Sequence, residues 1–195
     1  MLFSARHHWA FCAVIHFEDE SNVSVDDYLE MIHLKTSCLI SASIRIGAIL
    51  AGADETVDAI LAEIGDHAGL AFQIQDDYLG IWGDTIATGK SNLTDLITRK
   101  KTYPILLGLS CCPSFKTAWD ANAQVTPELA RHMAELLSNC SVDESTIEAV
   151  FYHLKQIRER QKSLPLGEET KNDYLWSLMN SAFSPTFGVS SKSAQ

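Results

Sequence analysis

The chain has 195 residues, of which 46% are apolar and 21% are charged, and its formal net charge is −10 with an isoelectric point near 5.0. This composition excludes a disordered chain, because it contains enough apolar residues to form a core. The acidic balance argues against a nucleic-acid-binding surface, which requires clustered Lys and Arg.

The N-terminal region carries no convincing targeting signal. The patch from Trp9 to Ile15 is only weakly apolar and lacks a clean hydrophobic region. The most apolar stretch, Cys38–Ala53, contains Arg45 and is too short to span a bilayer. The five cysteines form no CxxC pair and no even framework. We therefore expect a soluble, cytoplasmic protein with reduced thiols and no membrane span.

The first predicted element is a long helix from Val25 to about Gly52. Residues on one of its faces recur at alternating steps of four and three, which is the period of an amphipathic helix. This stripe consists of Tyr28, Ile32, Lys35, Leu39, Ala42, Ile46 and Ile49. The rest of the helix is also largely apolar, which predicts a central position in a helical bundle.

A second long helix is predicted from Glu55 to about Leu79. The short link after Gly52 predicts that these two helices pack antiparallel. The second helix is followed by a loop that contains Gly80, Gly83 and Gly89.

Shorter elements follow, and none shows the alternation of a β-strand. Thr102 is predicted as the N-cap of a helix with Pro104 in its first turn, and Thr126 as the N-cap of another. The expected elements are a turn at Asp95–Lys101 and helices at Tyr103–Ser110, Thr126–Ser138, Asp143–Gln161 and Thr170–Phe183. The predicted fold class is therefore all-α.

The most informative segment is FQIQDDYLGIWGD, residues 72–84. On a helix, Gln73 lies one turn before both Asp76 and Asp77, so the three side chains share one shoulder. Neighbouring carboxylates repel each other unless a cation lies between them, and Mg²⁺ is suited to this role because it accepts further ligands from phosphate and water. The alternative interpretation is a solvated acidic patch before a loop.

Several lysines can converge on this carboxylate pair. Lys35 is the only charged residue on the first apolar stripe, and Lys90 follows Gly89 in the loop after the pair. Lys100 and Lys101 follow the turn at Asp95. A lone Lys can snorkel to solvent, and a Gly-Lys can be a solvated loop tip. Lysines that converge on a metal-binding pair instead form a diphosphate site, where each close pair of opposite charges contributes up to ~4 kcal/mol before desolvation.

These motifs resemble a known family. FQIQDDYLGIWGD, followed by TGKxxxxD and KK, closely resembles the second aspartate-rich motif of the polyprenyl synthetases, which include farnesyl and geranylgeranyl diphosphate synthases. YLEMIHLKTSCLISASIRIGAILAG is similar to the family's helix with a Lys-Thr pair. The resemblance is strong from Phe17 to Leu109, and the later helices fit only in helical character and length. It implies an isoprenoid-synthase-type bundle.

The resemblance also implies roles for the metal-binding and cation-stabilising residues. Asp76 would bind a Mg²⁺ that bridges to an allylic diphosphate. Asp77 would act as a further metal ligand or would position the residues that bind the metal. Thr36 and Gln73 would lie near the developing allylic cation.

The lysines would hold the diphosphate itself. The resemblance implies that Lys35, Lys90 and Lys100 bind this group and help it to leave. In this family the double bond of isopentenyl diphosphate attacks the resulting carbocation, and loss of a proton gives a longer prenyl diphosphate.

The sequence departs from the family pattern in two ways. The family often has DDxxD, whereas the fifth position here is Gly80. The family also has an earlier aspartate-rich motif, with arginines beside it, and no such motif occurs before Val23. A Gln-x-x-Asp is expected where Phe11 and Val14 stand.

These departures predict an N-terminally truncated or frameshifted gene product. Residues 1–16 would be an unrelated or irregular segment, residues 17–184 the C-terminal part of a polyprenyl synthetase domain, and residues 185–195 a disordered tail. Because half of the catalytic site is missing, we expect the chain to be inactive alone. With part of its bundle missing, it should also leave the stripe through Ile32, Leu39 and Ile46 partly uncovered.

Two other interpretations remain at this stage. The chain can be a non-catalytic subunit in a homo- or hetero-oligomer with a complete synthase. It can also be a fragment of a class I terpene cyclase, which has the same helical fold and metal chemistry. The pairing of FQIxDDxxGxxGD with TGK favours the chain-elongating synthases.

Overall fold

The computed structural model describes residues 23–83 and 93–165, and these residues form helices with no strand among them. The elements in chain order are α2 (Val25–Ile32), the π-helical turn η1 (His33–Ser37), α3 (Cys38–Leu50), α4 (Glu55–Trp82), α6 (Thr94–Ile97), α7 (Tyr103–Cys111), α8 (Pro113–Ala121), α9 (Pro127–Asn139) and α10 (Val142–Lys162). The predicted all-α fold class is confirmed. Within the same two ranges, no helix is long and apolar enough to cross a membrane.

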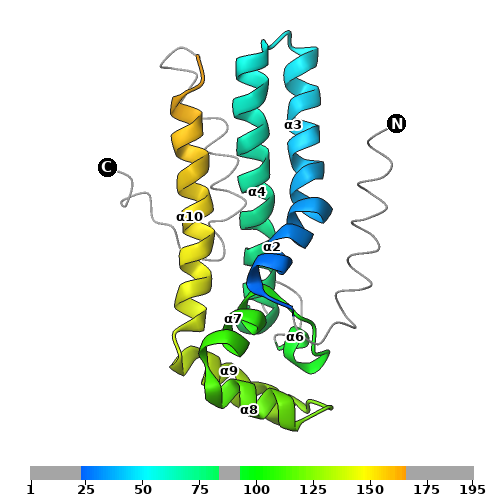
Figure 1. Cartoon of the computed structure of the whole chain (residues 1–195), viewed down its shortest axis with the longest axis vertical. Coiled ribbons are helices and arrows are strands. Elements are labelled where there is room, and N and C mark those ends of the chain that lie inside the picture. The colour runs from blue at the N-terminus through cyan, green and yellow to red at the C-terminus, as the bar shows by residue number, and fades with distance from the viewer. Residues whose placement is uncertain (1–22, 84–92, 166–195) are drawn as a thin grey trace.

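The long helices α3, α4 and α10 lie side by side, with α4 between the other two (Figure 1). The antiparallel packing predicted for the first two long helices is confirmed, and a short link after Leu50 joins them. The helices α7, α8 and α9 gather at the end of the bundle where α4 finishes (Figure 1). α4 is therefore the central element of the described structure.

Two apolar cores hold this arrangement together. The first joins α2, α4, α7 and α10 and includes Tyr28, Ile32, Ile64, Ala68, Ile74, Leu106, Val150, Leu154 and Ile157. The second joins the end of α4 to α6–α9 and the first residue of α10, and includes Ile81, Leu96, Ile105, Phe115, Trp119, Met133, Leu137 and Val142. Burial of these side chains is the main contribution to stability.

The predicted first helix is interrupted by a π-helical turn, and this changes which of its faces is buried. A π-turn contains more residues than an α-turn, so it rotates all later side chains away from the expected register. Before the turn, Ile32 is buried as part of the core, so the predicted uncovered part of the stripe does not include it. After the turn, Leu39 and Ile46 are 55% and 60% exposed, as expected.

Small residues allow α3 to approach α4 closely after this turn. Gly65 of α4 faces Ser41, and Gly69 faces Ser37, so that any side chain at either glycine would overlap the opposing residue. The Ser41 hydroxyl donates to the Ala62 carbonyl at 3.0 Å, which adds a polar contact between the two helices. This close approach brings η1 against the half of α4 that carries the Asp pair.

Replacing Gly69 by alanine is expected to lower the free energy of unfolding by about 1–3 kcal/mol, because the new methyl group overlaps Ser37 and forces the helices apart. Gly47→Ala is the matched control, since a methyl group there meets nothing within 4 Å. The control should stabilise the exposed helix position by roughly 0.5–1 kcal/mol. Denaturant unfolding of both variants tests the close approach, and equal effects of the two substitutions would contradict it.

The helix boundaries follow their local signals. Ser24 and Asp27 form a reciprocal capping box at the start of α2. Thr126 caps α9 as predicted, accepting from the Leu129 N–H at 3.3 Å. The helix α8 was not predicted, although Pro113 at its first position is a known start signal. The predicted helix at 170–183, the tail at 185–195 and the N-terminal segment 1–16 lie outside the described residues.

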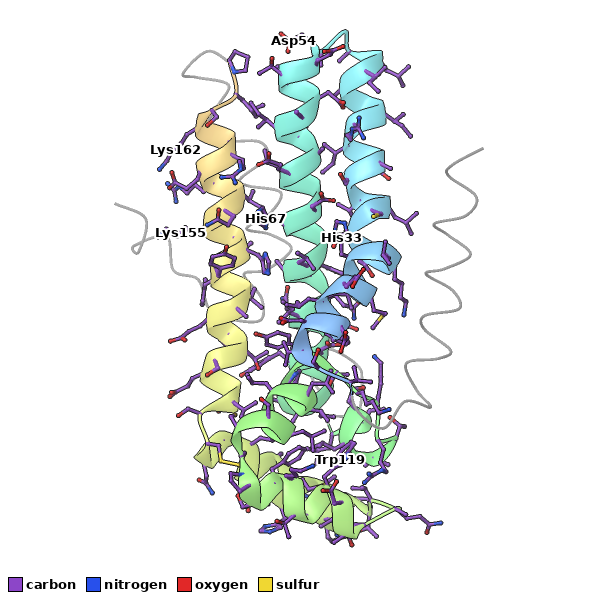
Figure 2. All side chains as sticks on the ribbon, in the orientation of Figure 1. His33, Asp54, His67, Trp119, Lys155 and Lys162 are labelled. Carbon is purple, nitrogen blue, oxygen red and sulfur yellow. A yellow bond between two sulfur atoms is a disulfide. The ribbon has the colours of Figure 1, made fainter. Side chains whose placement is uncertain are left out.

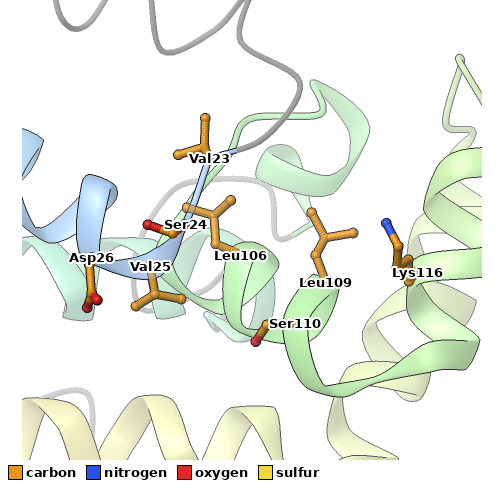
Figure 3. A pocket seen from close by; sticks show the side chains of 8 residues that line it. All are labelled: Val23, Ser24, Val25, Asp26, Leu106, Leu109, Ser110 and Lys116. Atoms are coloured by element: carbon orange, nitrogen blue, oxygen red, sulfur yellow. The ribbon is translucent and has the colours of Figure 1, made fainter.

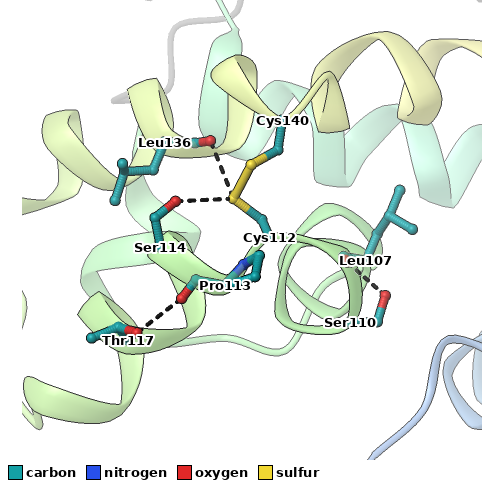
Figure 4. Close-up of a disulfide and its surroundings, with 8 residues drawn as sticks. All are labelled: Leu107, Ser110, Cys112, Pro113, Ser114, Thr117, Leu136 and Cys140. Carbon is teal, nitrogen blue, oxygen red and sulfur yellow. Dashed lines mark hydrogen bonds between the residues drawn. A yellow bond between two sulfur atoms is a disulfide. The ribbon is translucent and has the colours of Figure 1, made fainter.

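The expectation that all the cysteines are reduced is wrong for one pair. Cys112 and Cys140 form a disulfide with Cα atoms 6.0 Å apart (Figure 4). The two residues are 28 positions apart in the sequence and meet because α8 and α9 fold back on each other. Spacing alone gives no sign of such a pair. Cys111, the neighbour of Cys112, is an exposed free thiol.

Candidate functional site

Asp77 is the most tightly held member of the predicted site. It is fully buried on α4. Its Oδ2 atom accepts hydrogen bonds from the Tyr28 hydroxyl of α2 and from the backbone N–H of Tyr103, the latter at 3.1 Å. Its Oδ1 atom accepts from Nε2 of Gln73 at 3.3 Å. One carboxylate thus ties together the starts of α2 and α7 and the middle of α4.

Asp77 also supplies the N-terminal cap of α7. Thr102 occupies the N-cap position as predicted, but its side chain makes no capping hydrogen bond. The N–H of Tyr103, the first residue of α7, instead donates to Asp77. A carboxylate at a helix N-terminus is favourable because the unpaired N–H groups carry partial positive charge.

The burial of Asp77 affects its ionisation. Burial raises the pKa of Asp77 to about 6, and this effect is opposed by the hydrogen bonds from Tyr28 and Tyr103 and by the positive charge of Lys100. The negative charge of Asp95 raises the same pKa further. Burial and the nearby Asp77 charge in turn raise the pKa of Tyr28 above its ordinary value. Lys100 and Asp95 therefore act electrostatically on the same buried carboxylate.

Thr36 and Gln73 are brought together in the structure. The Thr36 hydroxyl donates to Oε1 of Gln73 at 3.2 Å, and the Gln73 amide donates to Asp77. The donors and acceptors alternate along this chain of hydrogen bonds, so the Gln73 amide has one preferred orientation. Lys35 precedes Thr36 in the same π-turn and is exposed. Single π-turns inside helices are frequent at functional sites.

Asp95 is a candidate functional residue that the sequence analysis did not assign. A side chain at Gly80 would overlap the Asp95 carboxylate, so Asp95 occupies the space beside α4 that a residue-80 side chain would need. Gly80 is the position where the family motif often has its third Asp. The sequence did contain a signal for this role. Gly80 replaces the third Asp of the motif, but Asp95 follows in TGKxxxxD, so Asp76, Asp77 and Asp95 together still provide three carboxylates. Asp76, half-buried on α4, lies one turn before Gly80.

The remaining predicted residues lie at the edge of this cluster or outside the description. Lys100 is exposed and follows Asp95, whose carbonyl accepts from the Lys100 backbone N–H at 2.9 Å. Lys90 lies outside the described residues. In ranges 23–83 and 93–165, no three His, Cys, Asp or Glu side chains are grouped so as to hold a metal by themselves. A Mg²⁺ ion at Asp76 would therefore take most of its ligands from phosphate and water, as this ion commonly does.

A pocket of about 390 Å³ lies elsewhere, between the start of α2 and the helices α7 and α8 (Figure 3). Its walls include Val25, Leu106 and Leu109, with Asp26 and Lys116 as the charged groups. None of the predicted site residues lines it. The pocket is therefore separate from the cluster around Asp77.

Comparison with known proteins gives a consistent result. The family model for polyprenyl synthetases matches residues 12–140. Geranylfarnesyl diphosphate synthase of Aeropyrum pernix is 48% identical over 90 residues, which are 46% of this chain and 28% of the relative. Farnesyl diphosphate synthase of Escherichia coli is 40% identical over 133 residues, which are 67% of this chain and 42% of the relative.

Solved structures show the same similarity at the level of the fold. A polyprenyl synthetase from Streptomyces coelicolor superposes with a TM-score of 0.82 at 31% identity, covering 92% of this chain and 56% of that one. The chain thus spans roughly half the length of this solved structure and less than half of the two curated relatives.

Proposed function

Because the chain belongs to the polyprenyl synthetase family, we propose that it provides the part of a prenyltransferase site that binds an allylic diphosphate through Mg²⁺. The observation that carries this proposal is the chain of hydrogen bonds from Thr36 through Gln73 to Asp77, beside which Asp76 and Asp95 present further carboxylates. It joins the Lys-Thr helix to the aspartate-rich helix, the two motifs on which the resemblance depends.

In this proposal the three carboxylates have different roles. Asp76 lies one helical turn before Gly80, and the Asp95 carboxylate lies against Gly80. These two carboxylates would hold Mg²⁺, whose charge would stabilise the leaving diphosphate. Both oxygens of Asp77 already accept hydrogen bonds from protein groups. Asp77 is thereby suited to positioning Asp76 rather than to binding the metal directly.

The lysines and the neutral polar groups complete the proposed site. Lys35, Lys90 and Lys100 would neutralise the diphosphate, and the charge of Lys100 already reaches Asp77. The oxygens of Thr36 and Gln73, held by their mutual hydrogen bond, would face the allylic cation as it forms. Fixed dipoles stabilise such a charge without the cost of reorganising solvent.

The complete reaction would extend an allylic diphosphate by condensation with isopentenyl diphosphate. The family's earlier aspartate-rich motif does not occur in these 195 residues, so they would supply only part of the metal-binding groups. The exposed apolar residues of α3 provide a surface against which the groups that complete the site could pack. They are Leu39, Ile46, Ile49 and Leu50.

The binding part of the proposal is tested by titrating the 195-residue chain with inorganic pyrophosphate, with and without Mg²⁺, in a calorimeter. We expect weak binding that requires Mg²⁺ and falls by about 10-fold or more in Asp76→Asn, because a charge-assisted contact is lost. Glu148→Gln removes the same charge from an exposed position on α10 and should bind normally. Binding without Mg²⁺, or unchanged binding by Asp76→Asn, would show that the site is wrongly assigned.

The catalytic part is tested with the same samples in a prenyl-transfer assay, using farnesyl and isopentenyl diphosphates. We expect no product from the chain alone, and light scattering should show association through the apolar residues of α3. Robust product from a monodisperse monomer would contradict the proposal that these residues supply only part of the site.

A further inference from the structure

Two histidines meet in the interface between α4 and α10, away from the Asp76–Asp77 pair. The Nδ1 atom of His67 lies 3.0 Å from the Nδ1 atom of His153, and the ring centroids are 5.3 Å apart. His153 is 9% exposed. Figure 2 shows His67 where the two long helices run side by side. This pair takes no part in the proposed function, and the inference below does not depend on it.

The contact between the two Nδ1 atoms requires a particular protonation state. A hydrogen bond forms when one Nδ1 carries a hydrogen and the other has a free lone pair. When both imidazoles are protonated, both Nδ1 atoms carry hydrogens and neither can accept. Two positive charges then face each other at hydrogen-bond distance in a largely buried interface, which is unfavourable.

The charged groups around the pair compensate for only part of this cost. On α4, Glu63 and Asp66 favour protonation of His67, whereas Arg160 of α10 opposes it. Glu63 is already engaged in an ion pair with Arg160. On α10, Tyr152 packs edge-on against His153 and brings no negative charge. The main compensating charge is thus Asp66, next to His67 in the sequence.

We propose that the His67–His153 pair is an acid-sensitive contact that loosens α10 from α4 when both imidazoles become protonated. Its release would expose the first apolar core, where Ile64 of α4 packs with Val150 and Ile157 of α10. α4 also carries the candidate site, so acidification would loosen the element that supports it.

The direction of the pH effect follows from the ionisation of the two groups. Burial, with a smaller effect of the His67 charge, lowers the pKa of His153 to about 4, and burial also lowers the pKa of His67. A histidine with a lowered pKa binds protons more readily when α10 is open than when it is closed. The closed state is therefore favoured near neutral pH and loses this advantage as the pH falls from about 6.5 towards 4.

Hydrogen exchange of the α10 backbone amides in the full chain tests this proposal, with rates at pH 7.5 and pH 5 corrected for intrinsic exchange. We expect the opening constant of α10 to rise about 30-fold on acidification, given the shift of His153 alone. In His153→Gln, which keeps a hydrogen-bonding side chain but does not titrate, the rise should be several-fold smaller. Asp77, whose pKa is about 6, also titrates between pH 7.5 and pH 5. It is present in both the unmodified chain and His153→Gln, so it does not account for a difference between them.

His132→Gln is the matched control, because His132 is an exposed histidine on α9. It should behave like the unmodified chain. If His153→Gln is unfolded, His67→Gln provides the same comparison from the other helix. If both variants are unfolded at pH 7.5, the pair has an essential structural role and the proposed pH-sensitive role is overturned. An equal rise in the unmodified chain and in the folded variant would also overturn the proposal.

Discussion

Replacing Asp77 by leucine is expected to lower the free energy of unfolding by about 3–5 kcal/mol. The substitution removes the acceptor for the Tyr28 hydroxyl, the Tyr103 N–H and the Gln73 amide at once. Tyr28 is only 2% exposed, so its hydroxyl has little access to water as a substitute partner. α7 also loses its N-terminal cap. Denaturant unfolding followed by far-ultraviolet circular dichroism measures the loss.

A double-mutant cycle with Tyr28→Phe separates the hydrogen bond from general packing effects. Tyr28→Phe alone leaves Asp77 with its contacts to Gln73 and Tyr103. The double variant should be less destabilised than the sum of the two single variants by about 1 kcal/mol or more, because the two substitutions remove both partners of the same hydrogen bond. Additive effects, or a loss below about 1 kcal/mol for Asp77→Leu, would mean that the carboxylate does not organise this region.

Removing the Cys112–Cys140 disulfide is the second substitution with a large expected effect. The bond closes a segment of 28 residues that contains α8 and α9. Loss of this constraint increases the entropy of the unfolded chain, so Cys140→Ser should lower the free energy of unfolding by about 3–4 kcal/mol. The loss is measured by denaturant unfolding without reductant.

Cys111→Ser is the matched control for the disulfide. Cys111 precedes Cys112 but is an exposed free thiol, so its replacement should change stability by less than about 0.5 kcal/mol. A dithiol reductant should destabilise the unmodified chain and Cys111→Ser alike, with no further effect on Cys140→Ser. If the reductant does not destabilise the unmodified chain, and Cys140→Ser is as stable as the unmodified chain, the disulfide does not contribute to stability.

The sequence by itself determined the long helices and the family. Hydrophobic periodicity and cap residues predicted the bounds of the long helices to within a few residues. Both signals are local, because they depend only on residues within or next to the helix itself. The composition of residues 72–84, read with the Lys35-Thr36 pair, was sufficient to indicate the family, and the matching family model confirms it. Thr36 and Gln73 were expected to lie in one site and are hydrogen-bonded to each other.

The tertiary structure alone decided the contacts between elements that are distant in the sequence. The π-turn shifted the buried face of the first helix, so that Ser37 and Ser41 pack against α4, a change that depends on how η1 packs against α4. The cap of α7 comes from Asp77 rather than from Thr102, and Asp95 fills the space beside Gly80. Such pairings depend on where the helices meet in space. Sequence spacing carries no record of that geometry, because each partner looks ordinary in its own local segment.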